Sequence, residues 1–128
     1  MNVTEFEDKY RIREEMKGSF HDKLFEFIDS RGLSNREVYV KSNLDRKQFS
    51  KIQCSPYMKP CKKYILALCI GLELSEEETL DILSRADKAI NPNDIRDQYV
   101  LGFIKDKNYN LDYINSFLDE RNLEILGM

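Results

Sequence analysis

The sequence predicts an all-α fold of about seven short helices. Apolar residues recur three, four or seven positions apart, as along one face of a helix, first at Phe20, Leu24 and Phe27. Ser-x-x-Glu patterns, which begin helices by satisfying free backbone N–H groups, recur along the chain. No segment alternates with period two, and no Asn-Gly or Asp-Gly hairpin turn occurs. These three observations favour helices and exclude a sheet.

The first expected element is a charged helical arm over residues 1–18. Thr4 and Glu7 form a capping box, and we expect the helix to end near Gly18. The next helix begins at Ser19 and ends at Gly32. Residues 1–18 therefore precede the packed part of the chain.

Two short helices are expected in the middle of the chain. Ser34 and Glu37 form a second capping box, which opens the first of them. A non-helical turn follows over residues 42–44, and Asp45 then caps a helix through about residue 54. Phe49 and Ile52 anchor that helix to the core, so its basic side chains point mostly outward.

Four further helical segments are expected after this pair. Pro60 is placed in the first turn of an apolar, buried helix over about 60–72. A capping box at Ser75 opens a helix to about residue 89, with Leu80 facing inward. Asn91 and Pro92 open the next helix. The apolar residues expected along the last two segments are Ile95, Tyr99, Phe103, Ile104, Leu111, Ile114, Phe117 and Leu118.

Charge is unevenly distributed, although the net charge of the chain is only −3. Residues 36–63 contain eight cations and two anions, whereas residues 1–35 have a net charge of −2 and residues 73–128 a net charge of −7. A basic middle section is typical of a surface that meets a polyanion. The alternative is a solvated basic face, above all over residues 59–63.

The chain contains no sign of a membrane span, a secretory signal, a metal site or a catalytic centre. Its three cysteines, Cys54, Cys61 and Cys69, are expected to be free thiols in a reducing cytoplasm, with Cys69 in the core. Its one histidine, His21, has no plausible nucleophile or set of metal ligands beside it in the sequence. We therefore expect a cytoplasmic protein that is not an enzyme and that needs no cofactor.

Residues 24–74 resemble the lambda-repressor-like (Xre-type) helix-turn-helix family, and the resemblance extends over about residues 20–90. The matching features are Gly32-Leu33-Ser34 opening helix two, Leu44 before a cap at Asp45, and Phe49-Ser50-Lys51-Ile52 in helix three. The chain departs from the family at Tyr39 and Ser42, where Ala and Gly are usual. The resemblance implies a five-helix domain over residues 19–90, between the arm and a C-terminal helical extension over 91–128.

The resemblance also implies a role for particular side chains on double-stranded DNA. The recognition helix would span about residues 45–54, and it would read base edges in the major groove. Contacts to phosphate would set the register without reading sequence. The expected base-reading residues are Arg46, Lys47, Gln48 and Lys51, and the expected phosphate contacts are Asn35, Arg36, Lys59 and Lys62.

Two functions remain open at this point. The first is a small bacterial or phage transcriptional regulator that binds a near-palindromic DNA site as a homodimer. The second is an adaptor, such as an antitoxin-like or defence-system partner, in which the helix-turn-helix is only a scaffold. In the second, the acidic C-terminal part with its apolar end, residues 123–128, would contact a protein partner.

Overall fold

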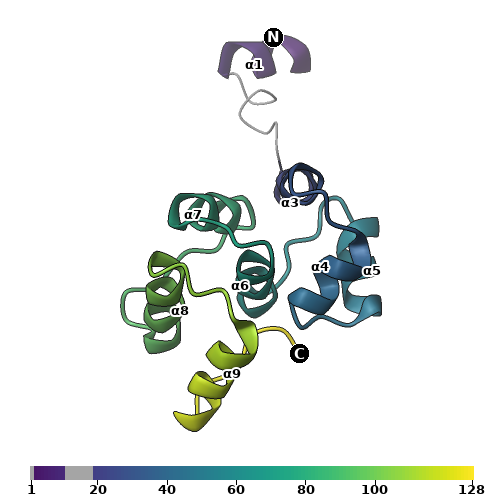
Figure 1. Cartoon of the computed structure of the whole chain (residues 1–128). Coiled ribbons are helices and arrows are strands. Elements are labelled where there is room, and N and C mark those ends of the chain that lie inside the picture. The colour runs from purple at the N-terminus through teal and green to yellow at the C-terminus, as the bar shows by residue number, and fades with distance from the viewer. Residues whose placement is uncertain (1, 11–18) are drawn as a thin grey trace.

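A computed structural model of the chain describes residues 2–10 and 19–128. These residues form eight helices and no strand, which confirms the all-α prediction (Figure 1). Figure 1 shows α1 apart from the helical body that α3–α9 form. The helices are α1 (Val3–Tyr10), α3 (Phe20–Ser30), α4 (Asn35–Lys41), α5 (Arg46–Cys54), α6 (Lys62–Gly71), α7 (Glu76–Arg85), α8 (Ile95–Lys105) and α9 (Leu111–Glu120).

The expected capping boxes at Ser34 and Ser75 are both present. Each serine hydroxyl accepts a hydrogen bond from the backbone N–H three residues later, and the glutamate there accepts one from the serine N–H. Asp45 caps α5 by accepting the Gln48 N–H at 2.7 Å. These contacts are local in sequence, which explains why the sequence predicts them well.

Three helix starts differ from the expected ones. α1 begins one residue before Thr4, and Asn2 accepts the Glu5 N–H at 2.7 Å in its place. α6 begins after Pro60, which lies before its N-cap. α8 is capped by Asp94 and not by Asn91. For α1 and α8 a neighbouring residue that also suits the position makes the cap, whereas Cys61 at the start of α6 makes no side-chain capping hydrogen bond. The expected end of the arm near Gly18 lies outside the described residues.

Two side chains expected in the core are exposed. Leu80 in α7 and Ile95 in α8 are 41% and 56% exposed. Their helices instead bury Ile82 and Val100. The inward face of α8 therefore differs in part from the expected one, because Ile104 is buried as predicted but Ile95 is not. A helix with many apolar residues has several possible inward faces, and tertiary packing selects one of them.

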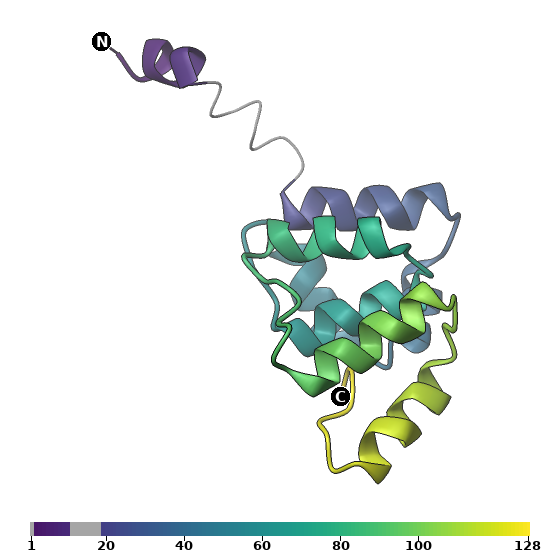
Figure 2. The same ribbon diagram turned by 90° about the vertical axis from the view of Figure 1, so that its left-hand side faces the viewer.

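α6 is the central helix of the body, as its apolar sequence predicts. Every residue from Ile65 to Gly71 is buried, and α4, α7 and α9 all pack against this helix (Figures 1 and 2). The buried residues form one cluster that runs from Phe20 to Leu126. Residues 91–128 therefore share their core with residues 19–90.

α4 and α6 approach each other unusually closely at Gly71. A Cβ atom at this position would lie 2.3 Å from the Ser42 hydroxyl oxygen and 3.1 Å from the backbone of Lys41. Only glycine leaves room for this contact. The end of α4 is thereby held against the end of the buried helix.

The cysteines are free thiols, and Cys69 is in the core, as expected. Burial raises the pKa of the Cys69 thiol to about 12, so the reactive thiolate is scarce at neutral pH. Cys54 and Cys61 are exposed. No helix in residues 2–10 or 19–128 combines the length and the apolar character that crossing a membrane requires.

Candidate nucleic-acid interface

A four-residue turn joins α4 to α5, where the sequence predicts a non-helical break. Asn43 adopts a left-handed conformation with φ of 53°. Asparagine tolerates this conformation better than most residues. Ser42 has an ordinary φ of −96°, which does not require glycine. The chain thus reverses at Asn43, and the Leu44 N–H donates to the Tyr39 carbonyl at 2.9 Å.

Buried side chains attach α5 to the body along one face. Phe49 and Ile52 are at most 3% exposed, as predicted, and Leu44 in the turn is also buried. The Phe49 ring lies 6.0 Å from the rings of both Tyr39 and Phe25. These contacts hold α5 against α3 and α4 and leave its other face to solvent.

α4 and α5 carry exposed cations without acidic partners among the described residues. Arg46, Lys47 and Lys51 of α5 are exposed, and so are Arg36 and Lys41 of α4. None of these five forms an ion pair with a described residue, whereas the other lysines and arginines of residues 19–128 do, except Lys88 and Lys107. The unpaired positive charge is concentrated on two consecutive helices.

Gln48 lies differently from its three basic neighbours. Its side chain is half-buried, and its amide nitrogen donates a hydrogen bond to the Tyr64 hydroxyl of α6. Its amide oxygen is buried and has no partner within residues 2–10 and 19–128. Contact with a base would require the Gln48 amide to break its hydrogen bond with the Tyr64 hydroxyl.

The four residues expected to contact phosphate fall into two groups. Asn35 and Arg36 are exposed at the start of α4. Lys59 instead forms an ion pair with Asp87. Lys62 lies 2.7 Å from the carboxylate of Asp97, which is fully buried. The two lysines are therefore engaged within the molecule.

Lys41 is an exposed cation that the sequence-based set omits. It lies in the last turn of α4, on a helix whose one buried residue is Val38. A residue three positions from Val38 is expected on the same face of the helix, so the sequence pattern does not predict this exposure.

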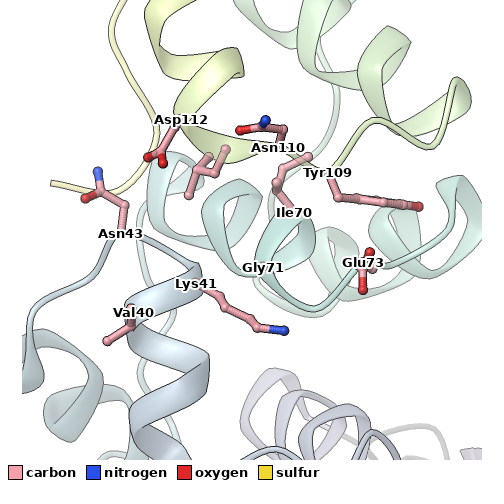
Figure 3. Close-up of a pocket in the computed structure, with 10 residues that line it drawn as sticks. Val40, Lys41, Asn43, Ile70, Gly71, Glu73, Tyr109, Asn110 and Asp112 are labelled. Carbon is pink, nitrogen blue, oxygen red and sulfur yellow. The ribbon is translucent and has the colours of Figure 1, made fainter.

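A pocket of about 330 Å³ lies beside this surface, where α4, α6 and α9 meet (Figure 3). Lys41, Glu73 and Asp112 line it, so it carries charges of both signs. The Tyr109 hydroxyl, also in its lining, donates to the Leu74 carbonyl at 2.7 Å. Burial raises the pKa of Tyr109 above its ordinary value. This mixture of charges indicates no single class of ligand.

Comparisons of the chain with protein-family models, with curated proteins and with solved structures found no match.

Proposed function

We propose that this protein binds double-stranded DNA through α4 and α5 and acts as a sequence-specific transcriptional regulator. The observation that supports the proposal best is the group of five exposed cations without ion pairs on these two helices. Unpaired lysine and arginine side chains can neutralise phosphates without first breaking an internal contact. Binding then gains free energy from the counterions that leave the DNA.

In the proposed complex, α5 lies in the major groove. Arg46, Lys47 and Lys51 reach guanine O6 and N7, which accept hydrogen bonds from cationic side chains. Arg36, Lys41 and Asn35 contact phosphates beside the groove and set the register. A homodimer would place two copies of α5 about 34 Å apart, on adjacent turns of one face of the duplex.

A titration of duplex DNA from upstream of the coding sequence, followed by fluorescence polarisation, tests the proposal. Replacing Arg46 and Lys51 by alanine should weaken binding about tenfold or more, because contacts to bases are lost. Replacing Arg36 and Lys41 by alanine should reduce the slope of log affinity against log salt by about 2, because two phosphate contacts are lost. Lys23→Ala with Lys105→Ala is the matched control, because both lysines are ion-paired on other helices. Binding that ignores salt and survives the first pair of substitutions would refute the proposal.

A second candidate function, an adaptor that binds a protein, is favoured by an aromatic cluster on α8 and α9. The Phe117 ring lies 4.9 Å from that of Tyr99 and 5.1 Å from that of Phe103. Arg121 lies 3.5 Å above Phe117. All three rings are only partly buried, and Tyr113 beside them is 53% exposed. Aromatic residues with arginine are enriched at protein interfaces.

Co-purification with surface variants separates the two candidates. Ile95 is 56% exposed and lies one helical turn before Tyr99 on the same face of α8. Ile95→Ser with Tyr113→Ser should abolish capture of a stoichiometric protein partner and leave DNA binding unchanged. Tyr57→Ser is the control, because Tyr57 is 94% exposed and lies in the loop between α5 and α6. A partner retained by the Ile95 and Tyr113 variant would exclude this aromatic surface as the contact.

A further inference from the structure

The end of the chain returns to the helical body and packs against it. The C-terminal tail, defined here as residues 123–128, leaves α9 and runs back toward the middle of the molecule (Figure 2). Leu126 is fully buried, and Gly127 is buried beside it. The tail is thus an integral part of the fold.

The tail contacts the turn that joins α4 to α5. The Met128 N–H donates to the Asn43 carbonyl at 2.9 Å. The Asn43 side-chain amide donates in return to the carbonyls of Leu126 at 3.1 Å and Met128 at 3.3 Å. The tail therefore holds Asn43 at both its backbone and its side chain.

Gly127 permits this contact because of its conformation and its size. Its φ is 79°, a value that other residues rarely adopt. A Cβ atom at this position would lie 2.4 Å from the Asn43 carbonyl oxygen and 2.9 Å from that of Ser42. Any larger residue would force the tail and the turn apart.

Residues of two helices also form hydrogen bonds with the tail. Asn115 of α9 accepts the Leu126 N–H at 2.8 Å and donates to its carbonyl at 3.0 Å. The Gly127 N–H donates to the carbonyl of Lys63 in α6 at 3.2 Å. Recognition through main-chain groups, with one apolar side chain in a buried site, is how proteins bind extended peptides.

We propose that the C-terminal tail acts as a built-in peptide ligand of the α4–α5 turn and sets the orientation of α5. Leu126 and Gly127 would then be positioning residues for the DNA surface, although they lie far from α4 and α5 in the sequence. Asn43 carries the coupling, because its left-handed backbone determines how α5 leaves α4. This inference rests on the proposed DNA binding only for its functional consequence.

Asn43→Gly tests the coupling with little change to the turn itself. Glycine keeps the left-handed backbone and the carbonyl that Met128 uses, but it removes both side-chain hydrogen bonds to the tail. We expect amide hydrogen exchange of Gly127 and Met128 to accelerate about tenfold and DNA affinity to fall about fivefold. Asn122→Gly is the matched control, since Asn122 has a φ of 57° and is exposed.

Gly127→Val in the full chain tests the coupling between the C-terminal tail and the α4–α5 turn by a substitution in the tail itself. Valine should lift the tail, shift the amide NMR signals of residues 43–51 and accelerate their hydrogen exchange. Adding a synthetic peptide with the sequence of residues 123–128 should reverse these shifts, because it can occupy the vacated site. The same peptide should have no effect on the wild-type protein at equal concentration.

The outcomes separate this inference from the proposed function. Signals of residues 43–51 that stay unchanged in Gly127→Val, or that the peptide does not restore, would overturn the role of the tail. Wild-type protein that binds no duplex would refute the proposed function, while the NMR and exchange measurements would still decide the coupling. A loss of DNA affinity in Asn122→Gly equal to that in Asn43→Gly would also overturn the inference.

Discussion

Two groups of cations that look alike in the sequence behave differently in the structure. Arg46, Lys47 and Lys51 of α5 are exposed and form no ion pair with a described residue. Lys59, Lys62 and Lys63, only a few residues later, are each paired with an acidic residue from the C-terminal half. The net charge of a segment therefore overstates the number of its cations that are free to bind a partner.

Several acidic residues of the segment 73–128, which has a net negative charge, form ion pairs with basic residues elsewhere in the fold. Asp97 of α8 is buried, and its carboxylate accepts hydrogen bonds from both the Lys62 ammonium and the Asn91 N–H. Glu124 lies between Lys63 and Arg96, at 3.3 and 3.8 Å. Asp87, Asp97 and Glu124 form ion pairs with lysines at or just before the start of α6. Their negative charges are therefore neutralised within the molecule. Among residues 19–128, the cations without an ion pair are the five of α4 and α5 together with Lys88 and Lys107.

The largest predicted change in stability comes from breaking the ion pair between Lys62 and the buried Asp97. Asp97→Asn keeps the shape of the side chain but leaves the Lys62 ammonium half-buried without its counter-charge. We expect a loss of about 3 kcal/mol in the free energy of unfolding, as is typical when one partner of a buried pair is removed. Chemical denaturation followed by circular dichroism measures this loss.

Asp112→Asn is the control for that substitution. Asp112 is exposed in the first turn of α9 and has no ion pair within the described part of the chain. Its replacement should change the free energy of unfolding by about 0.5 kcal/mol at most. Equal effects at Asp97 and Asp112 would mean that burial of the ion pair contributes nothing to stability.

A smaller effect is expected at the ion pair between Arg31 and Glu78. The Ser75 N–H, and after it Arg31, hold the pKa of Glu78 below its ordinary value. The contribution of this carboxylate to stability is therefore present above the unfolded-state pKa and is lost as pH falls through the folded-state pKa. Glu78→Gln should cost about 0.5 kcal/mol at pH 7, because solvent screens a pair this exposed.

Thermal unfolding of wild type and Glu78→Gln across the acid range measures this dependence. The two proteins should converge in stability once Glu78 is protonated in the folded state. A difference that stays constant from neutral to acid pH would show that the charge of Glu78 is not the cause.

The smallest effect is expected for the unpaired group. Replacing Arg46 and Lys51 by alanine should change the free energy of unfolding by less than about 0.5 kcal/mol, since neither side chain is ion-paired. The same thermal unfolding measurement checks this expectation. A loss above about 1 kcal/mol would show that these side chains stabilise the fold. A loss of DNA binding in the same variant would then reflect lost stability as well as lost contacts.

The helices themselves could be predicted from the sequence because their signals are local. The capping boxes at Ser34 and Ser75, the cap at Asp45 and the buried Phe49 and Ile52 each depend on residues within a few positions of one another. The errors arose where two neighbouring residues could serve equally well, as at Asn91 and Asp94. Local chemistry predicts that a helix starts there, but not which residue caps it.

Leu80 and Ile95 show a different limit. Both are apolar at helical spacing, and both are exposed because α7 and α8 turn other faces toward α6 and α9. The same limit applies to Gln48, whose position on α5 suggests a base contact but whose amide reaches Tyr64. Which face of a helix is buried depends on its neighbours.

The sequence by itself determined the all-α class, the two short helices around Asn43 and the basic character of the middle section, because these depend on near neighbours and composition. Only the tertiary structure decided which cations remain unpaired and that the tail contacts the turn. Lys62 meets Asp97 across 35 residues, and Asn43 meets Leu126 across 83. Partners so distant in the chain leave no periodic or local signal, and packing around α6 brings them together.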